Sequence, residues 1–183
     1  MLTLNCNKTF AALDEINVPD NPVLRISSML IIGGMAHIQE QAHDLFEDDF
    51  NTVIAFATQL AQIGVQIDRP SIRLNNGDLC KGDDFIADRT SADLIISAFV
   101  NKDFKPGPDD FEFFESPLLK EGGTWSEAFA QANPKFIGLN TNMMDCVGAE
   151  DIPGHYRLIF TNSAGSDHRM LYAREDILPE LRL

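Results

Sequence analysis

The sequence predicts an α/β fold, specifically a three-layer Rossmann-like sandwich with a mostly parallel central sheet. Short, uninterrupted apolar runs such as 29–32 and 94–96 are typical of strands buried on both faces. A longer stretch with helical periodicity lies between two such runs, and turn residues separate the segments. This alternation is typical of α/β domains. We expect residues 29–183 to form a single α/β domain and residues 1–28 an N-terminal attachment.

The first 28 residues predict one short helix and the approach to a strand. Thr9 is a candidate N-cap for an amphipathic helix that ends before the Pro19 to Pro22 turn. Residues 23–28 are expected to be extended, and 29–32 form a strand that Gly33-Gly34 ends. We interpret this strand as the centre of the sheet.

The segment from Phe50 to Gly64 predicts a helix. Its apolar positions recur with helical spacing, and Gly64 with the turn at 68–70 ends it before a second strand at 71–74. The β-branched residues within 52–57 also permit a strand there. We favour the helix because a long periodic stretch outweighs a short apolar run.

The next buried strand is expected over residues 92–100, which should need a helix on each face. The long connection over residues 101–121 is interpreted either as a lid over a site or as a segment packed by its own aromatic side chains.

Gly122-Gly123 then opens a short helix, and a strand follows over residues 135–139. Thr124 and Glu127 have the spacing of a capping box, in which each side chain bonds the other residue's backbone. A glycine turn before a helix N-terminus also binds anionic ligands. Both interpretations stay open. Two further strands, 156–160 and 169–174, and a short helix near 177–181 complete the prediction.

The charge composition limits the classes of partner that the chain is expected to bind. The net charge is −14, and this repels phosphate backbones and anionic membrane surfaces. We therefore expect no nucleic acid polymer and no membrane as a partner, whereas a small molecule fits. The sequence leaves homo-oligomerisation open.

The cysteines and histidines indicate neither a disulfide framework nor a metal site. The three cysteines are an odd number without C-x-x-C spacing, as expected of reduced thiols in a cytoplasmic protein. His37 and His43 are six positions apart, which places them on different faces of a helix. No apolar run approaches the roughly 18 residues of a membrane span.

Polar residues follow the carboxyl ends of the predicted strands, where open α/β sheets bind ligands. We expect a polar ring there that binds a small molecule. Its ligand-binding members are Gly33, Gly34, His37, Asn76, Gly77, Ser97, Asn101, Gly122, Gly123, Thr124 and Asn140, and its carboxylates include Asp78 and Glu127. Asp78 is also a turn residue, and Asp93 a group that pairs at a strand start.

The order of residues 92–96, then 123–127, then a Pro-Lys-Phe-Ile-Gly-Leu strand resembles the nucleoside 2-deoxyribosyltransferase-like group and the related lysine-decarboxylase-like nucleotide hydrolases. The resemblance covers roughly residues 29–142. It implies a nucleoside or nucleotide substrate, no cofactor, and chemistry at an N-glycosidic bond. Glu127 would be the catalytic nucleophile, and Asp78 or Asp93 the acid or the sugar-binding group.

A second resemblance is to class I S-adenosylmethionine-dependent methyltransferases. It takes residues 52–57 as a strand and 156–174 as the family's closing hairpin, and it implies S-adenosylmethionine as the cofactor with Asp78 facing the adenine. The glycine loop at 33–34 is shorter than that family's pattern. A third hypothesis is a non-catalytic ligand-binding or interaction protein.

Overall fold

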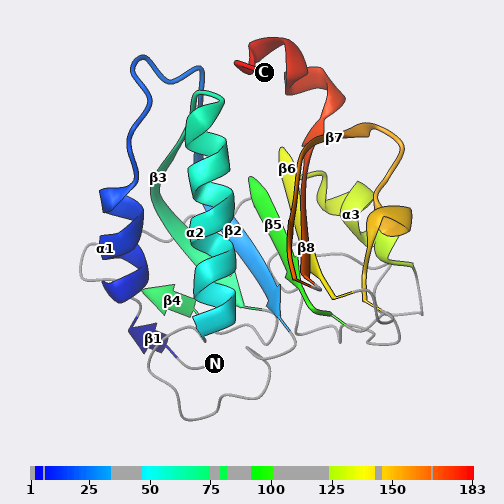
Figure 1. The fold of residues 1–183 in the computed structure, drawn as a ribbon, viewed down its shortest axis with the longest axis horizontal. Coiled ribbons are helices and arrows are strands. Elements are labelled where there is room, and N and C mark those ends of the chain that lie inside the picture. The colour runs from blue at the N-terminus through cyan, green and yellow to red at the C-terminus, as the bar shows by residue number, and fades with distance from the viewer. Residues whose placement is uncertain are drawn as a thin grey trace.

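The computed structural model describes residues 3–5, 7–33, 47–74, 79–81, 92–100, 124–142, 146–165 and 167–183. These residues form one eight-stranded sheet in the order β1-β4-β3-β2-β5-β6-β8-β7 (Figure 1). The strands are β1 (Thr3–Asn5), β2 (Leu24–Gly33), β3 (Val65–Leu74), β4 (Leu79–Lys81), β5 (Leu94–Ala98), β6 (Phe136–Thr141), β7 (Tyr156–Ala164) and β8 (Asp167–Arg174). The helices are α1 (Asn7–Glu15), α2 (Glu47–Gln62), α3 (Trp125–Ala132), η3 (Ala149–Asp151) and η4 (Glu175–Glu180), the last two being 3₁₀ helices.

The prediction of a three-layer Rossmann-like sandwich with a mostly parallel central sheet is wrong. The sheet is mixed and curled, and strands outweigh helices (Figure 1). Three of the seven pairings between described strands are antiparallel: β3–β4, β6–β8 and β7–β8. Links as short as 75–78 and 165–166 allow only antiparallel neighbours, because a parallel crossover needs a dozen or more residues. Buried apolar runs occur in parallel and in antiparallel strands, so they do not decide the direction of a neighbouring strand.

Parallel pairing is confined to β1–β4 and to the group of β3, β2, β5 and β6. In the chain, α2 lies between the parallel neighbours β2 and β3. The helix predicted from Phe50 is confirmed, so the alternative strand at 52–57 is excluded. Gly64 ends the turn after α2 with a φ of 86°, a conformation that favours glycine.

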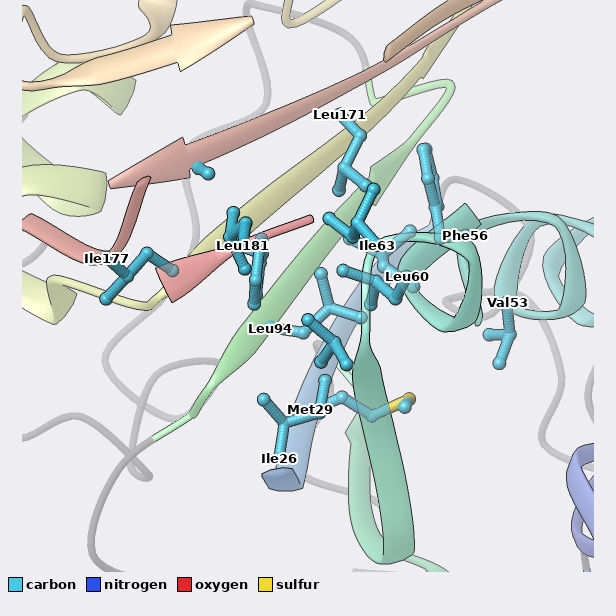
Figure 2. Close-up of a cluster of buried hydrophobic side chains, with 14 of the residues drawn as sticks. Ile26, Met29, Val53, Phe56, Leu60, Ile63, Leu94, Leu171, Ile177 and Leu181 are labelled. Atoms are coloured by element: carbon cyan, nitrogen blue, oxygen red, sulfur yellow. The ribbon is translucent and has the colours of Figure 1, made fainter. Parts of the chain in front are cut away.

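Side chains from the two faces of the sheet form two separate cores. On the α2 face, Phe56 and Leu60 of α2 pack with β2, β5 and β8. Ile177 of η4 and Leu181, directly after η4, join them (Figure 2). On the α3 face, Trp125 and Phe129 of α3 pack with the alternate residues of the same strands. The register explains this division, because paired residues share a face and successive residues alternate.

Close packing against α2 explains a glycine in the middle of β6. A Cβ added at Gly138 would lie 2.7 Å from Cε2 of Phe56, a fully buried ring. The ring therefore occupies the space that a side chain at this position would need, and it brings α2 close to the sheet.

The ends of the chain differ in part from the prediction. Thr9 lies inside α1 instead of capping it, and the strand β1 was not expected. Phe10 and Leu13 of α1 pack against the core on the α2 face. The predicted strands near 156–160 and 169–174 are confirmed as a hairpin, and the short terminal helix is the 3₁₀ helix η4.

Candidate functional site

The candidate site lies where the strands β2, β5 and β6 end together. On the α2 face, the strand register places five residues in one row across the sheet: Gly33, Ala98, Asn140, Arg169 and Asn162. The preceding row contains Ile96, Gly138 and Leu171 and belongs to the core. The α2 face thus changes from apolar to polar at the carboxyl ends of the parallel strands, which is the edge where such sheets bind ligands.

Asn140 is the most deeply buried polar residue of this row, with 2% of its surface exposed. Its Nδ2 donates to Thr52 Oγ1 of α2 at 2.8 Å, and its backbone carbonyl accepts from Phe99 N at 2.8 Å. Its Oδ1 is buried without a hydrogen-bond partner in the described part of the chain. An unpaired buried carbonyl is costly and is rare in folded proteins.

Arg169 is the antiparallel partner of Asn140 across the β6–β8 ladder. The residue is partly buried, and its Nε is buried without a hydrogen-bond partner among the described residues. The sequence did not point to Arg169 as a site residue. Arg169 and Arg174 both lie in the predicted strand 169–174, and only the register brings Arg169 beside Asn140.

Phe99, directly after β5, has a φ of 54°, which is uncommon for a bulky residue without a glycine's freedom. Strained backbone of this kind is concentrated at functional sites. Ser97, two positions before Phe99, is 1% exposed, and its Oγ has no partner among the described residues. Ser97 pairs with Leu139, so it lies on the α3 face. Two predicted site residues, Ser97 and Asn140, therefore lie near the carboxyl ends of β5 and β6, but on opposite faces of the sheet.

Thr124 and Glu127 form the capping box that the sequence predicted. Glu127 N donates to Thr124 Oγ1 at 3.2 Å, and Thr124 N donates to Glu127 Oε2 at 2.9 Å. Both residues are exposed. In this arrangement the Glu127 carboxylate is bound to the backbone of its own helix.

Asp93 lies directly before β5, at the end of the strands opposite the polar row. Its carboxylate accepts from Ser27 N at 2.8 Å and pairs with Lys135 Nζ at 2.7 Å. It therefore pairs at the strand start, as the sequence suggested. The five-residue strand β5 separates it from the carboxyl edge by about 16 Å at roughly 3.3 Å per residue. Glycosidic chemistry with two carboxylates requires them within about 5 to 10 Å of each other.

The other predicted site residues lie outside the described residues, as does the 101–121 connection. These residues are Gly34, His37, Asn76, Gly77, Asp78, Asn101, Gly122 and Gly123. Gly33 is the last residue of β2 and pairs with Ala98.

The largest resolved pKa shift belongs to Tyr156, near the edge opposite the polar row. Burial raises the pKa of Tyr156 well above its usual value, and its hydroxyl donates to Pro134 O at 2.5 Å. The neighbouring Asp176 accepts from Arg174 Nε at 2.6 Å, and this bond lowers the pKa of Asp176 and raises that of Arg174. These groups join the hairpin to the end of α3, since Arg174 Nη1 also donates to Asn133 O.

Among the described ranges, no three His, Cys, Asp or Glu side chains come together as metal ligands. Within the same ranges, no helix is long and apolar enough to cross a membrane. Comparison with known proteins found no matching family, no similar curated protein and no similar solved structure.

Proposed function

We propose that this chain binds a small molecule containing a nucleoside at the carboxyl ends of β5 and β6. The observation that carries the proposal is Asn140 Oδ1, which is buried without a hydrogen-bond partner among the described residues and belongs to the residue whose carbonyl accepts from the strained Phe99. A buried, unpaired polar group costs about 1 to 3 kcal/mol. A ligand that donates a hydrogen bond to Asn140 Oδ1 on the α2 face would offset this cost.

The nucleoside class follows from what the two sequence resemblances share. Substrates with an N-glycosidic bond and S-adenosylmethionine both contain a ribose and a base. Ribose hydroxyls and exocyclic amines donate to an acceptor such as Asn140 Oδ1. This acceptor is therefore suited to a nucleoside without fixing the reaction.

We place binding ahead of cleavage of an N-glycosidic bond. As nucleophile, the Glu127 carboxylate would first have to release the bond it accepts from Thr124 N, and Asp93 is held by Ser27 and Lys135 at the opposite end of the strands. Cleavage would thus require a second state of Glu127, with Asp78 as the remaining candidate acid.

A second candidate function is S-adenosylmethionine-dependent methyl transfer, favoured by the position of the terminal hairpin. β8 lies antiparallel between β6 and β7, as expected of the closing hairpin in the methyltransferase resemblance. That resemblance had taken residues 52–57 as its second strand. Here β3 is the strand that follows α2, so the correspondence is with β3 instead.

Calorimetric titration with adenosine, AMP and S-adenosylmethionine tests the proposal. Replacing Asn140 by alanine removes the unpartnered Oδ1 and also the bond to Thr52, so nucleoside binding should weaken several-fold while stability falls by about 1 kcal/mol. Ser163→Ala is the control, because it removes an exposed hydroxyl that bonds His168 on the hairpin. Absence of binding by all three compounds, or equal affinity in wild type and Asn140→Ala, would refute the proposal.

A reducing compartment such as the cytoplasm belongs to the same proposal. Cys146 is a free, partly buried thiol, and an odd number of cysteines does not suit a disulfide framework. The net charge of −14 supports a small ligand over a nucleic acid polymer or an anionic membrane, and homo-oligomerisation stays open.

A further inference from the structure

We propose that Arg169 and Asn140 form a phosphate-binding subsite on the α2 face of the sheet. The inference rests on the proposed function in one respect, namely that a ligand binds at this edge. It adds the chemical group that the ligand presents there, and a residue, Arg169, that the sequence did not suggest.

Geometry brings the two side chains together. Arg169 and Asn140 are antiparallel partners, so they share a face of the sheet and their Cβ atoms lie about 4.5 to 5.5 Å apart. Among the described residues, Arg169 Nε is a buried donor without a partner and Asn140 Oδ1 a buried acceptor without one. A group that both accepts and donates hydrogen bonds would satisfy the two atoms together.

The lack of a described partner for its Nε distinguishes Arg169 from the other arginines whose side chains the structure describes. Arg25, Arg157 and Arg174 pair with Asp68, Glu175 and Asp176. Arg182 donates to the backbone carbonyls of Asp20 and Asn21. In this set only Arg169 has a buried Nε without a hydrogen-bond partner among the described residues, although the chain carries 28 acidic residues. This is the arrangement expected of a cation that binds an external anion.

A protonated phosphate meets both requirements. Arg169 Nε–H would donate to a phosphate oxygen, and a phosphate O–H would donate to Asn140 Oδ1. Sulfate and carboxylate ions have no proton to donate near neutral pH, so they would leave Asn140 Oδ1 unpaired. Phosphate esters keep one O–H below their second pKa of about 6. The subsite should therefore prefer phosphate over sulfate in mildly acidic solution.

Titration of the whole chain with sodium phosphate and with sodium sulfate, at equal ionic strength and about pH 6, tests the subsite. We expect phosphate to bind and sulfate to bind several-fold more weakly. Arg169→Gln should weaken phosphate binding about tenfold or more, since it removes a charge-assisted bond. Arg157→Gln is the matched control and should leave binding unchanged, because Arg157 of β7 pairs with Glu175 of η4. Equal sulfate affinity, no phosphate binding, or full affinity in Arg169→Gln would overturn the inference.

A second variant covers the case in which Arg169→Gln does not fold. Asn140→Asp places a carboxylate opposite Arg169, and the internal ion pair should replace the phosphate. We expect a folded protein that has lost phosphate binding. Phosphate affinity equal to that of the wild type in Asn140→Asp would contradict the assignment.

Adenosine and AMP then separate the two proposals and the two sources of phosphate. If AMP binds more tightly than adenosine, and only AMP loses affinity in Arg169→Gln, the phosphate belongs to a nucleotide. If free phosphate binds and AMP gains nothing over adenosine, the subsite takes the free ion. Equal adenosine and AMP binding without any phosphate binding would refute the subsite and leave the nucleoside site standing. Phosphate binding without nucleoside binding would refute only the latter.

Discussion

Thr124 and Glu127 hold each other's backbone amides at the start of α3, through bonds of 3.2 and 2.9 Å. The reciprocal bonds satisfy two N–H groups that a helix start otherwise leaves without an internal partner. The same carboxylate was the candidate nucleophile, so its role can be separated by substitutions that differ in charge and in hydrogen bonding.

Glu127→Ala should lower the free energy of unfolding by about 0.5 to 1 kcal/mol, because it removes one of the two reciprocal bonds of the capping box. Glu127→Gln should stay near wild type, because glutamine also closes a capping box. Urea denaturation of the three proteins measures both effects. If Glu127→Gln is stable but loses release of a base from nucleosides that the wild type cleaves, the carboxylate has a chemical role as well. Equal stability of Glu127→Ala and wild type would contradict the cap.

Gly138→Ala should destabilise the fold by about 1 to 3 kcal/mol, because the added Cβ would lie 2.7 Å from the buried Phe56 ring. Gly154→Ala is the control, since nothing lies within 4 Å of a Cβ placed there. Chemical denaturation compares the two. Combining Gly138→Ala with Phe56→Leu should cost less than the sum of the single changes, as expected for residues in contact. An additive result would show that the ring does not set the limit.

Asp93→Ala should cost about 1 to 3 kcal/mol, because Ser27 N loses its acceptor and the partly buried Lys135 loses its partner. Asp68→Ala, which breaks the exposed pair with Arg25, should cost less than about 1 kcal/mol. Thermal unfolding ranks the two variants. Nucleoside binding should be unaffected in Asp93→Ala, since the residue lies at the far edge. A selective loss of binding with normal stability would return Asp93 to the site.

Stability should fall as the pH rises above about 10, the ordinary pKa of tyrosine. Burial raises the pKa of Tyr156 and of Tyr172, so the folded chain holds these protons more tightly than the unfolded chain does. This contribution is complete below pH 10 and is lost above it. The free energy of unfolding, measured from pH 8 to pH 11, should fall less steeply in Tyr156→Phe than in wild type.

At neutral pH the two tyrosines should differ. Tyr156→Phe should cost about 1 kcal/mol because it removes the bond to Pro134 O. Tyr172→Phe should cost less, since the acceptor of the Tyr172 hydroxyl among the described residues is the weak acceptor Met170 Sδ, at 3.7 Å. The reverse order would show that the Pro134 bond is not the stronger one.

Local patterns predicted most individual elements correctly. The periodicity from Phe50 gave α2, the Thr124 to Glu127 spacing gave the cap of α3, and the apolar run before Phe99 gave β5. Each depends on residues close in the chain. The three-residue strands β1 and β4 are too short for a pattern to reveal. The antiparallel pairings depend on the length of the links between strands, which the apolar pattern of the strands does not contain.

The site was predictable only in part for the same reason. Ser97 and Asn140 could be placed at the carboxyl edge from the strands that contain them. The pairing of Asn140 with Arg169 depends on the register between β6 and β8, which joins residues 29 positions apart. Likewise, no local signal shows that Asn140 bonds Thr52 on α2. Such non-local contacts decide which buried polar atoms remain unpaired.

Arg182 donates to the carbonyls of Asp20 and Asn21, 162 and 161 positions earlier, while its own N–H donates to Ile63 O. Contacts between such distant residues close very large loops, and the entropy of closure delays their formation. We expect these bonds of Arg182 to form after the rate-limiting step of folding. Its energy would then act mainly on the unfolding rate, so that Arg182 governs how long the folded chain persists more than how fast it forms.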